Sequence, residues 1–174
     1  MAAAPDYIVL KHHRDLAGLR RFHWVRRGLL AILLAFLVLG LLNLFGQRPD
    51  TVSAATQAAA LEVYSPSHVR GGLLFEARFH VHANQEIKDA ILVLDSGWAE
   101  GMTINTIEPS PVGEASRDGK LALDLGHVPQ GQSYILFVQL QVNPTNVGRR
   151  SQNAELFDGE THLLTVHRKV TIFP

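Results

Sequence analysis

Two histidines stand two positions apart in a segment where polar and apolar residues alternate. His80 and His82 fall on one side of this alternation, and Glu76 falls on the same side. Residues at i and i+2 of a β-strand point to one face, so the pattern gathers two imidazoles and a carboxylate, a ligand set that suits Zn²⁺ or Cu²⁺. His167 is a candidate third ligand. The alternative, which the sequence favours, is the solvent side of an amphipathic strand.

Motifs for nucleophilic or phosphate chemistry are absent from the sequence. It contains no cysteine, no G-x-S-x-G, no H-E-x-x-H, no phosphate-binding glycine loop and no EF-hand loop. The carboxylate pairs Asp95/Glu100 and Asp118/Asp124 carry no signal that would place either pair around a substrate. The sequence therefore predicts a protein that is not an enzyme, with no catalytic residue, no resident metal and no cofactor.

Two large apolar residues occupy the outward positions of the longest alternating segment, residues 133–142. These are Ile135 and Phe137. Adjacent exposed apolar side chains indicate a contact surface, so this pair is the candidate partner face. The alternative is that a loop, or the segment before the domain, covers them.

Three arginines lie in or near the two longest loops, residues 108–113 and 143–150. Loops at the ends of a β-sandwich often carry binding residues. Arg117, Arg149 and Arg150 are therefore candidate loop contacts for an anionic polymer or a partner. The alternative is that both segments are plain surface loops.

Turn signals divide residues 60–174 into short segments that are rich in β-branched and aromatic residues. This pattern is typical of an all-β sandwich or barrel, and the length suffices to bury a core without disulfides. We expect a mainly β protein with an immunoglobulin-like β-sandwich of seven to eight strands. The inner faces are expected to supply Phe75, Phe79, Val81, Leu136, Val138, Leu140, Val166, Val170 and Ile172.

One charged residue interrupts the inner-face pattern. Arg168 falls in the inward register of the last strand, between Val166 and Val170. It is either an ion-paired interior charge, or it marks a β-bulge or a side chain that extends to the end of the sandwich. The sequence favours the second account.

Residues 28–46 form the one long apolar segment of the sequence, and GLLAILLAFLVLGLLNLF, from 28 to 45, carries no charge. At about 1.5 Å per residue it spans roughly 27 Å, close to the ~30 Å hydrocarbon core of a bilayer. Arg26 and Arg27 precede it directly, and Trp24 is placed for the membrane interface. We expect a single transmembrane helix. The alternative is a cleaved signal peptide, which the length of the apolar segment and of its leader disfavours.

A formal net charge of zero conceals two oppositely charged parts. Residues 1–27 carry six basic and two acidic groups, whereas residues 60–174 carry nine basic and thirteen acidic groups. The positive-inside rule then predicts a cytoplasmic segment at 1–27 and an extracytoplasmic domain at 60–174 of a plasma-membrane protein. Residues 47–59 are expected to form a mobile spacer. Topology and contact with membrane lipid explain the basic segment, so no nucleic-acid partner is expected.

The segment between residues 91 and 142 resembles a known type of surface module. It reads ILVLD, then GMTINTIEPSP, then GKLALDLGHVPQGQSYILFVQLQV, in which residues 125–133 match an L-G-x-hydrophobic-P-x-G-x-S turn. It is similar to bacterial envelope modules of the DUF11 and CARDB type. The resemblance implies an immunoglobulin-like fold and a spacer or binding role on the cell envelope, with no catalytic residue to carry over. The chain differs in having one module and an N-terminal anchor.

These observations predict a non-enzymatic, single-pass membrane protein of the cell envelope. Its outer domain is expected to act as an accessory or interaction subunit of a larger membrane protein. The alternative is an extracytoplasmic module that binds a polymer, such as a cell-wall polymer, or another ligand.

Overall fold

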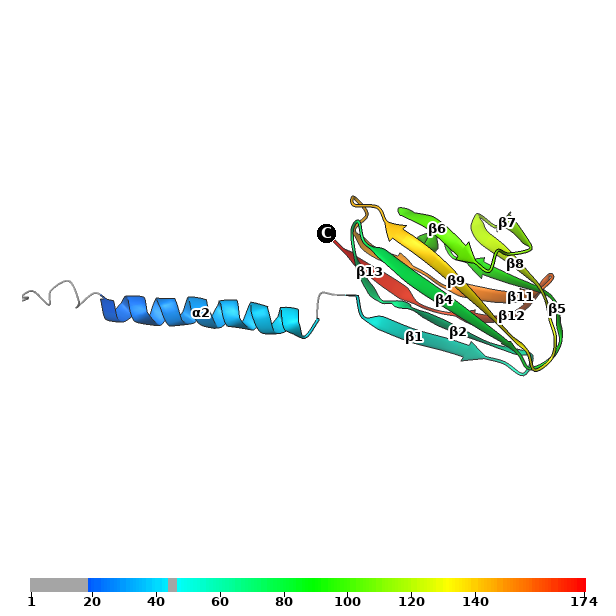
Figure 1. The fold of residues 1–174 in the computed structure, drawn as a ribbon, viewed down its shortest axis with the longest axis horizontal. Helices are drawn as coiled ribbons and strands as arrows, with labels where there is room; N and C mark the ends of the chain where they lie inside the picture. The colour runs from blue at the N-terminus through cyan, green and yellow to red at the C-terminus, as the bar shows by residue number, and fades with distance from the viewer. Residues whose placement is uncertain (1–18, 44–46) are drawn as a thin grey trace, which may run out of the picture. The chain divides into compact units, whose positions relative to one another are not determined.

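The structure is a computed structural model that describes residues 19–43 and 47–174, in two separate units. The first unit is helix α2 (Leu19–Leu41), shown in Figure 1. Its segment Phe22–Leu41 is long and apolar enough to cross a membrane. The helix runs through Arg26 and Arg27 without a break, and the Arg27 guanidinium lies 5.7 Å from the centroid of the Trp24 ring. The last residues of the expected span, 44–46, lie outside the described residues.

The described part of the second unit is built almost entirely of strands, with one short 3₁₀ helix (Figure 1). The elements are β1 (Pro49–Ala55), β2 (Ala59–Pro66), β3 (His68–Arg70), β4 (Leu74–Ala83), β5 (Ile87–Leu94), η2 (Ser96–Trp98), β6 (Met102–Glu108), β7 (Gly113–Arg117), β8 (Lys120–Val128), β9 (Ser133–Val142), β10 (Gly148–Ser151), β11 (Ala154–Asp158), β12 (Thr161–Val166) and β13 (Lys169–Phe173).

Two five-stranded sheets and one three-stranded sheet form the domain. The first sheet has the order β1-β2-β4-β9-β6, the second β12-β11-β5-β8-β7, and the third β10-β13-β3. Neighbouring strands are antiparallel except β13 and β3, which are parallel. Buried side chains from all three sheets form one hydrophobic core, and all nine expected inner-face residues belong to it. The mainly β, sandwich-like fold is therefore confirmed.

The spacer expected over residues 47–59 is not present as such, because residues 49–55 form the edge strand β1. This strand pairs with β2 in continuous register from Pro49↔Pro66 to Ala55↔Ala60. Its side chains are small and polar, which is why the sequence resembles a linker. Val52 and Ala54 nevertheless pack against the core, and an edge strand needs only one apolar face. The sandwich therefore begins before residue 60.

The described residues hold thirteen strands rather than the expected seven to eight. The additional ones are mostly short or edge strands, including β1, β3, β7 and β10. The last expected strand is also divided, because β12 belongs to the second sheet and β13 to the third. A short segment that changes sheet has no periodicity of its own, so alternation alone cannot locate the break.

The Asp118–Gly119 turn behaves as the dipeptide predicts. It joins β7 and β8 with Arg117 paired to Lys120, and both turn residues have positive φ, 51° at Asp118 and 76° at Gly119. This is the two-residue hairpin geometry that Asp-Gly favours.

Candidate partner-binding face

The outer face of the first sheet carries a cluster of large side chains from three neighbouring strands. The register places Tyr64 of β2 opposite Arg78 of β4, and Arg78 opposite Phe137 of β9. In the adjacent row, His80 of β4 lies opposite Ile135 of β9. Side chains alternate along each strand, so these five residues share the face that points away from the core. We call them the aromatic–arginine face.

Arg78 is held between two rings at the centre of this face. Its guanidinium lies 5.1 Å from the centroid of the Tyr64 ring and 5.6 Å from that of the Phe137 ring. Its Nε donates to Glu76 Oε1 at 2.6 Å, and this hydrogen bond and charge raise the pKa of Arg78 further above its usual value. Cation–π contacts and the carboxylate thus fix the orientation of an exposed, permanently charged group.

The two apolar residues predicted as a partner face lie on the surface of the domain. Ile135 is 44% exposed and Phe137 is 37% exposed. Together with Glu62, the aromatic–arginine face lines a shallow hollow of about 220 Å³. Residues 49–55, which were a candidate cover, instead form β1 at the sheet edge, separated from β9 by β2 and β4.

The candidate metal ligands do not converge. The Nδ1 atom of His82 lies 2.8 Å from Ser133 Oγ, and Glu76 is engaged with Arg78. His167 lies between β12 and β13, outside the first sheet. Within residues 19–43 and 47–174, no three or more His, Asp or Glu side chains are grouped so that they could hold a metal ion.

Arg117 lies against the outer face of the second sheet, and its guanidinium already has partners within the domain. Its Nη1 donates to the Gly159 carbonyl at 3.1 Å, and its Nη2 forms an ion pair with Glu160. The guanidinium also lies 4.2 Å from the centroid of the Phe157 ring. These contacts join the β7–β8 hairpin to the β11–β12 turn.

Arg149 and Arg150 lie on β10, in the third sheet. Arg150 Nη2 donates to Asn146 Oδ1 at 3.1 Å, and its Nη1 donates to the Arg149 carbonyl at 3.3 Å. The polar contacts of Arg117 therefore lie at the β11–β12 turn, whereas those of Arg150 lie on β10 itself and in the β9–β10 connection. The structure does not assemble the three arginines into one basic site.

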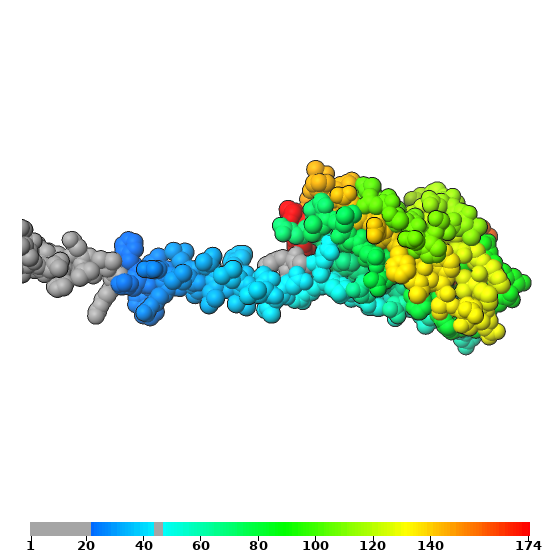
Figure 2. Space-filling model, viewed as in Figure 1, coloured from blue at the N-terminus to red at the C-terminus, as the bar shows by residue number. Residues whose placement is uncertain are grey.

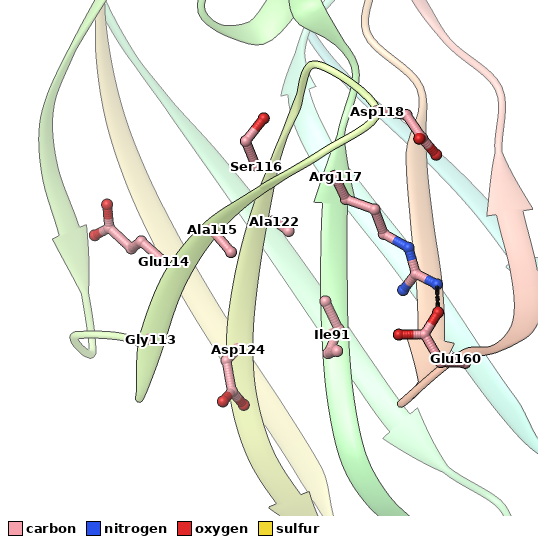
Figure 3. A pocket seen from close by; sticks show the side chains of 10 residues that line it. All are labelled: Ile91, Gly113, Glu114, Ala115, Ser116, Arg117, Asp118, Ala122, Asp124 and Glu160. Atoms are coloured by element: carbon pink, nitrogen blue, oxygen red, sulfur yellow. Dashed lines mark hydrogen bonds and ion pairs between the residues drawn. The ribbon is translucent and has the colours of Figure 1, made fainter.

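A larger open hollow of about 610 Å³ lies beside Arg117, over β5, β7 and β8. Figure 3 shows the Arg117 side chain extending to Glu160 at one side of the residues that line it. Its lining also includes the carboxylates of Glu114, Asp118 and Asp124. Acidic groups therefore outnumber the guanidinium, which makes this hollow a poor site for an anionic polymer. The sequence could not indicate it, because it depends on the pairing of β7 with β8.

A small network of charged and polar side chains lies beside this hollow and links β8 to nearby parts of the second sheet. Lys120 Nζ lies 2.6 Å from Glu155 Oε1 and 3.0 Å from Asp95 Oδ1, and Ser151 Oγ donates to Asp95 Oδ2 at 2.8 Å. Partial burial opposes ionisation of Asp95, but the hydrogen bonds from Lys120 and Ser151 outweigh it. The net result is a lowered pKa for Asp95.

Arg168 is buried in the break between β12 and β13. Its guanidinium donates to Gln152 Oε1 at 2.9 Å and to the carbonyls of Ser65 and Pro66 at 3.1 and 3.0 Å. It also lies 5.1 Å from the centroid of the Trp98 ring. Burial lowers the pKa of Arg168 to about 10, against the opposing charge of Asp50. Its hydrogen-bond partners are neutral oxygens, so neither the ion pair nor the solvent-reaching stem expected from the sequence describes it.

The sequence correctly predicted that Ile135 and Phe137 point outward, but it did not indicate the residues that surround them. Alternation places Arg78 on the outer side of β4, yet nothing in the sequence aligns it with Tyr64 and Phe137. That alignment depends on the cross-strand register, which short apolar patterns do not determine.

Comparisons with known proteins find similarity at the level of the fold. The structure is similar to the CARDB domain of PF1109 from Pyrococcus furiosus solved by NMR, with a TM-score of 0.42 and 14% identity over 73% of this chain and 97% of that one. For a crystal structure of that domain in complex with di-metal ions, the TM-score is 0.38 and the identity is 16%, over 73% of this chain and 96% of that one. For a non-cellulosomal cohesin from Archaeoglobus fulgidus, the TM-score is 0.40 and the identity is 12%, over 63% of this chain and 88% of that one.

CARDB domains are thus among the solved structures to which this chain is similar. No protein-family model and no curated protein matches the chain. At such low identity a shared arrangement of strands transfers no residue role.

Proposed function

We propose that this chain is a membrane-anchored interaction subunit of the cell envelope. Helix α2 anchors it in the plasma membrane as a single-pass protein, with its N-terminus in the cytoplasm and the sandwich outside. The sandwich binds a larger membrane protein as an accessory subunit, and membrane lipid surrounds the helix. An immunoglobulin-like sandwich with an apolar N-terminal helix is consistent with this role.

The observation that carries the proposal is the aromatic–arginine face. Tyrosine and arginine dominate the energetics of protein interfaces, and phenylalanine is enriched in them. Here Arg78 is held in one orientation by Tyr64, Phe137 and Glu76, so little side-chain entropy remains to be lost on binding. The pair Ile135 and Phe137 adds apolar area beside this fixed charge.

The direction of the anchor follows from charge. The six basic groups of residues 1–27 include Arg26 and Arg27, which stand next to the apolar segment. Basic residues at this position are retained on the cytoplasmic side, while Trp24 suits the headgroup region. This topology would leave the net negative residues 60–174 outside.

The test is a pull-down of a C-terminally tagged full-length copy from native membranes after brief crosslinking, read by mass spectrometry. We expect one membrane protein in near-equal amount. The double variant Ile135→Asp/Phe137→Asp should lower its recovery roughly tenfold or more, because two central contacts are lost. The matched control is Gln139→Asp/Gln141→Asp, on the same side of the same strand, which should retain most of the partner.

Equal recovery with both double variants would contradict the proposed face. Recovery of the chain alone, or with wall fragments, would favour the alternative function, a polymer- or ligand-binding module. The arrangement of Arg117, Arg149 and Arg150 gives that alternative little support, since they are not gathered and Arg117 is already paired.

A further inference from the structure

Two loops pack against each other at the end of the sandwich where β1 begins (Figure 2). Gly71 approaches Pro144 so closely that a Cβ at this position would lie 2.9 Å from the Pro144 carbonyl oxygen. Gly72 N donates to the Val142 carbonyl at 2.8 Å, and Val142 N donates to that of Leu73 at 3.1 Å. Residues 70–74 and 142–149 therefore present one continuous surface.

This surface exposes apolar side chains that the core does not use. Leu73, Leu74 and Val147 are 44%, 59% and 46% exposed. They are three of the six large apolar side chains that are exposed within residues 47–174. With Arg70 and Arg149, which are exposed beside them, we call this set the Leu74 end.

The charge of the Leu74 end is opposite to that of the rest of the domain. Residues 67–74, 142–149 and 172–174 contain Arg70 and Arg149 but no aspartate or glutamate. Residues 60–174 as a whole carry nine basic and thirteen acidic groups, so everything outside these segments has a net charge of −6. Glu76 lies two residues beyond Leu74 on the same side of β4, where its carboxylate is paired with Arg78, and the Glu100 carbonyl accepts from Asn146 Nδ2 in the second loop. A basic surface with exposed leucines matches a bilayer interface that contains anionic lipid.

Chain length brings this surface within reach of the membrane. Helix α2 ends at Leu41, and the Gln47 side chain is bonded to the Leu74 carbonyl at 3.0 Å. The six steps between Leu41 and Gln47 extend at most about 21 Å. The tether is therefore short enough for the Leu74 end to reach the lipid surface from which an anchored helix would emerge.

We infer that the Leu74 end docks on the bilayer that holds the anchor. Leu73, Leu74 and Val147 insert at the headgroup boundary, and Arg70 and Arg149 pair with lipid phosphates. This inference rests on the proposed membrane anchoring, but it does not depend on the identity of the partner protein.

The chain has no native cysteine, so single-cysteine variants of the full-length protein can carry one nitroxide each. The probes are Leu74→Cys and Val147→Cys. The controls are Leu33→Cys within the helix and Gln130→Cys in the turn between β8 and β9. The protein is placed in vesicles of equal parts phosphatidylcholine and phosphatidylglycerol. Collisions with oxygen, which enters lipid, are compared with collisions with a water-soluble nickel chelate.

Docking predicts that labels at 74 and 147 gain oxygen access and lose chelate access, as the label at 33 does, while the label at 130 stays water-exposed. If the labels at 74 and 147 behave like the label at 130 while that at 33 is in lipid, the docking is overturned and the anchor stands. If the label at 33 is also in water, the anchor fails and the inference fails with it.

A second comparison tests the chemistry of the contact with the label kept at 147. Arg70→Gln and Arg149→Gln should each shift the ratio of docked to undocked forms by roughly fivefold at low salt, and phosphatidylcholine alone should do the same. Leu74→Glu should release the label into water, whereas Gln130→Glu at the control turn should not. All these side chains are exposed, so the fold remains intact; no response to any of them would overturn the docking.

Discussion

At the scale of single residues, Arg168 shows how one buried cation organises the joint between two sheets. It connects Gln152 with the carbonyls at the end of β2, and its ring contact with Trp98 links it to the core. Trp98 Nε1 donates in turn to the Asn153 carbonyl at 3.1 Å. The residue that interrupted the inner-face pattern therefore holds the strand break in place.

Replacing Arg168 should destabilise the domain strongly. Arg168→Met removes three hydrogen bonds and leaves buried oxygens unpaired, so we expect a loss of about 2–4 kcal/mol in the free energy of unfolding. Urea denaturation measures this directly. The exposed neighbour Lys169→Met is the control and should change stability by less than about 0.5 kcal/mol. Equal midpoints for the two variants would show that the Arg168 contacts contribute nothing.

The Asp95–Lys120 contact should make the free energy of unfolding depend on pH in the acidic range. The pKa of Asp95 is lowered by folding, so its contribution is present at neutral pH and is lost as the pH falls through the folded-state value. Asp95→Asn should therefore cost about 1 kcal/mol at pH 7 and progressively less as the pH is lowered through the folded-state pKa of Asp95. Denaturation at a series of pH values tests this. The control is Glu114→Gln at an exposed position. For this variant, we expect no comparable pH-dependent decrease in the stability difference from the wild type.

At the scale of elements, the sequence predicted the central strands well and the edges poorly. The alternation of β4 and β9 located their inner faces, because a long strand repeats its signal several times. Strand β1 gives no such signal, since its outer face is polar and its inner face is built on Val52 and Ala54. The sequence likewise could not predict that Tyr64 lies beside Arg78, because this arrangement depends on how the strands pair rather than on either strand alone.

The status of β1 gives a direct prediction about domain boundaries. A fragment of residues 47–174 should be more stable than one of residues 60–174. The shorter fragment lacks β1, including the core contacts of Val52 and Ala54, and leaves the backbone of β2 without its edge partner. We expect a lower urea midpoint for the shorter fragment and greater aggregation. Identical midpoints would mean that residues 47–59 act as the spacer that their composition suggests.

At the scale of the whole molecule, the chain has two units, with the proposed anchor in the first and the proposed partner-binding residues in the second. The core draws on strands from all three sheets of the second unit, and its members all lie between residues 59 and 172. The proposed partner-binding residues lie along the middle of β2, β4 and β9, whereas the Leu74 end comprises the first residue of β4 and the loops beside β3 and β10. The protein and lipid contacts proposed for this domain therefore use different residues, although Leu74 and Arg78 share one side of β4.

The parallel pairing of β3 with β13 also limits when the third sheet can form during synthesis. Val69 pairs with Ile172, more than a hundred positions later in the chain. During synthesis, β3 must wait for the last strand before the third sheet can form. Until then, a chain emerging from the ribosome exposes apolar strands without their partners, which is when aggregation competes with folding. The third sheet can consequently form only after residues 169–173 have been made, and loss of β13 would leave β3 and β10 without a neighbour in that sheet.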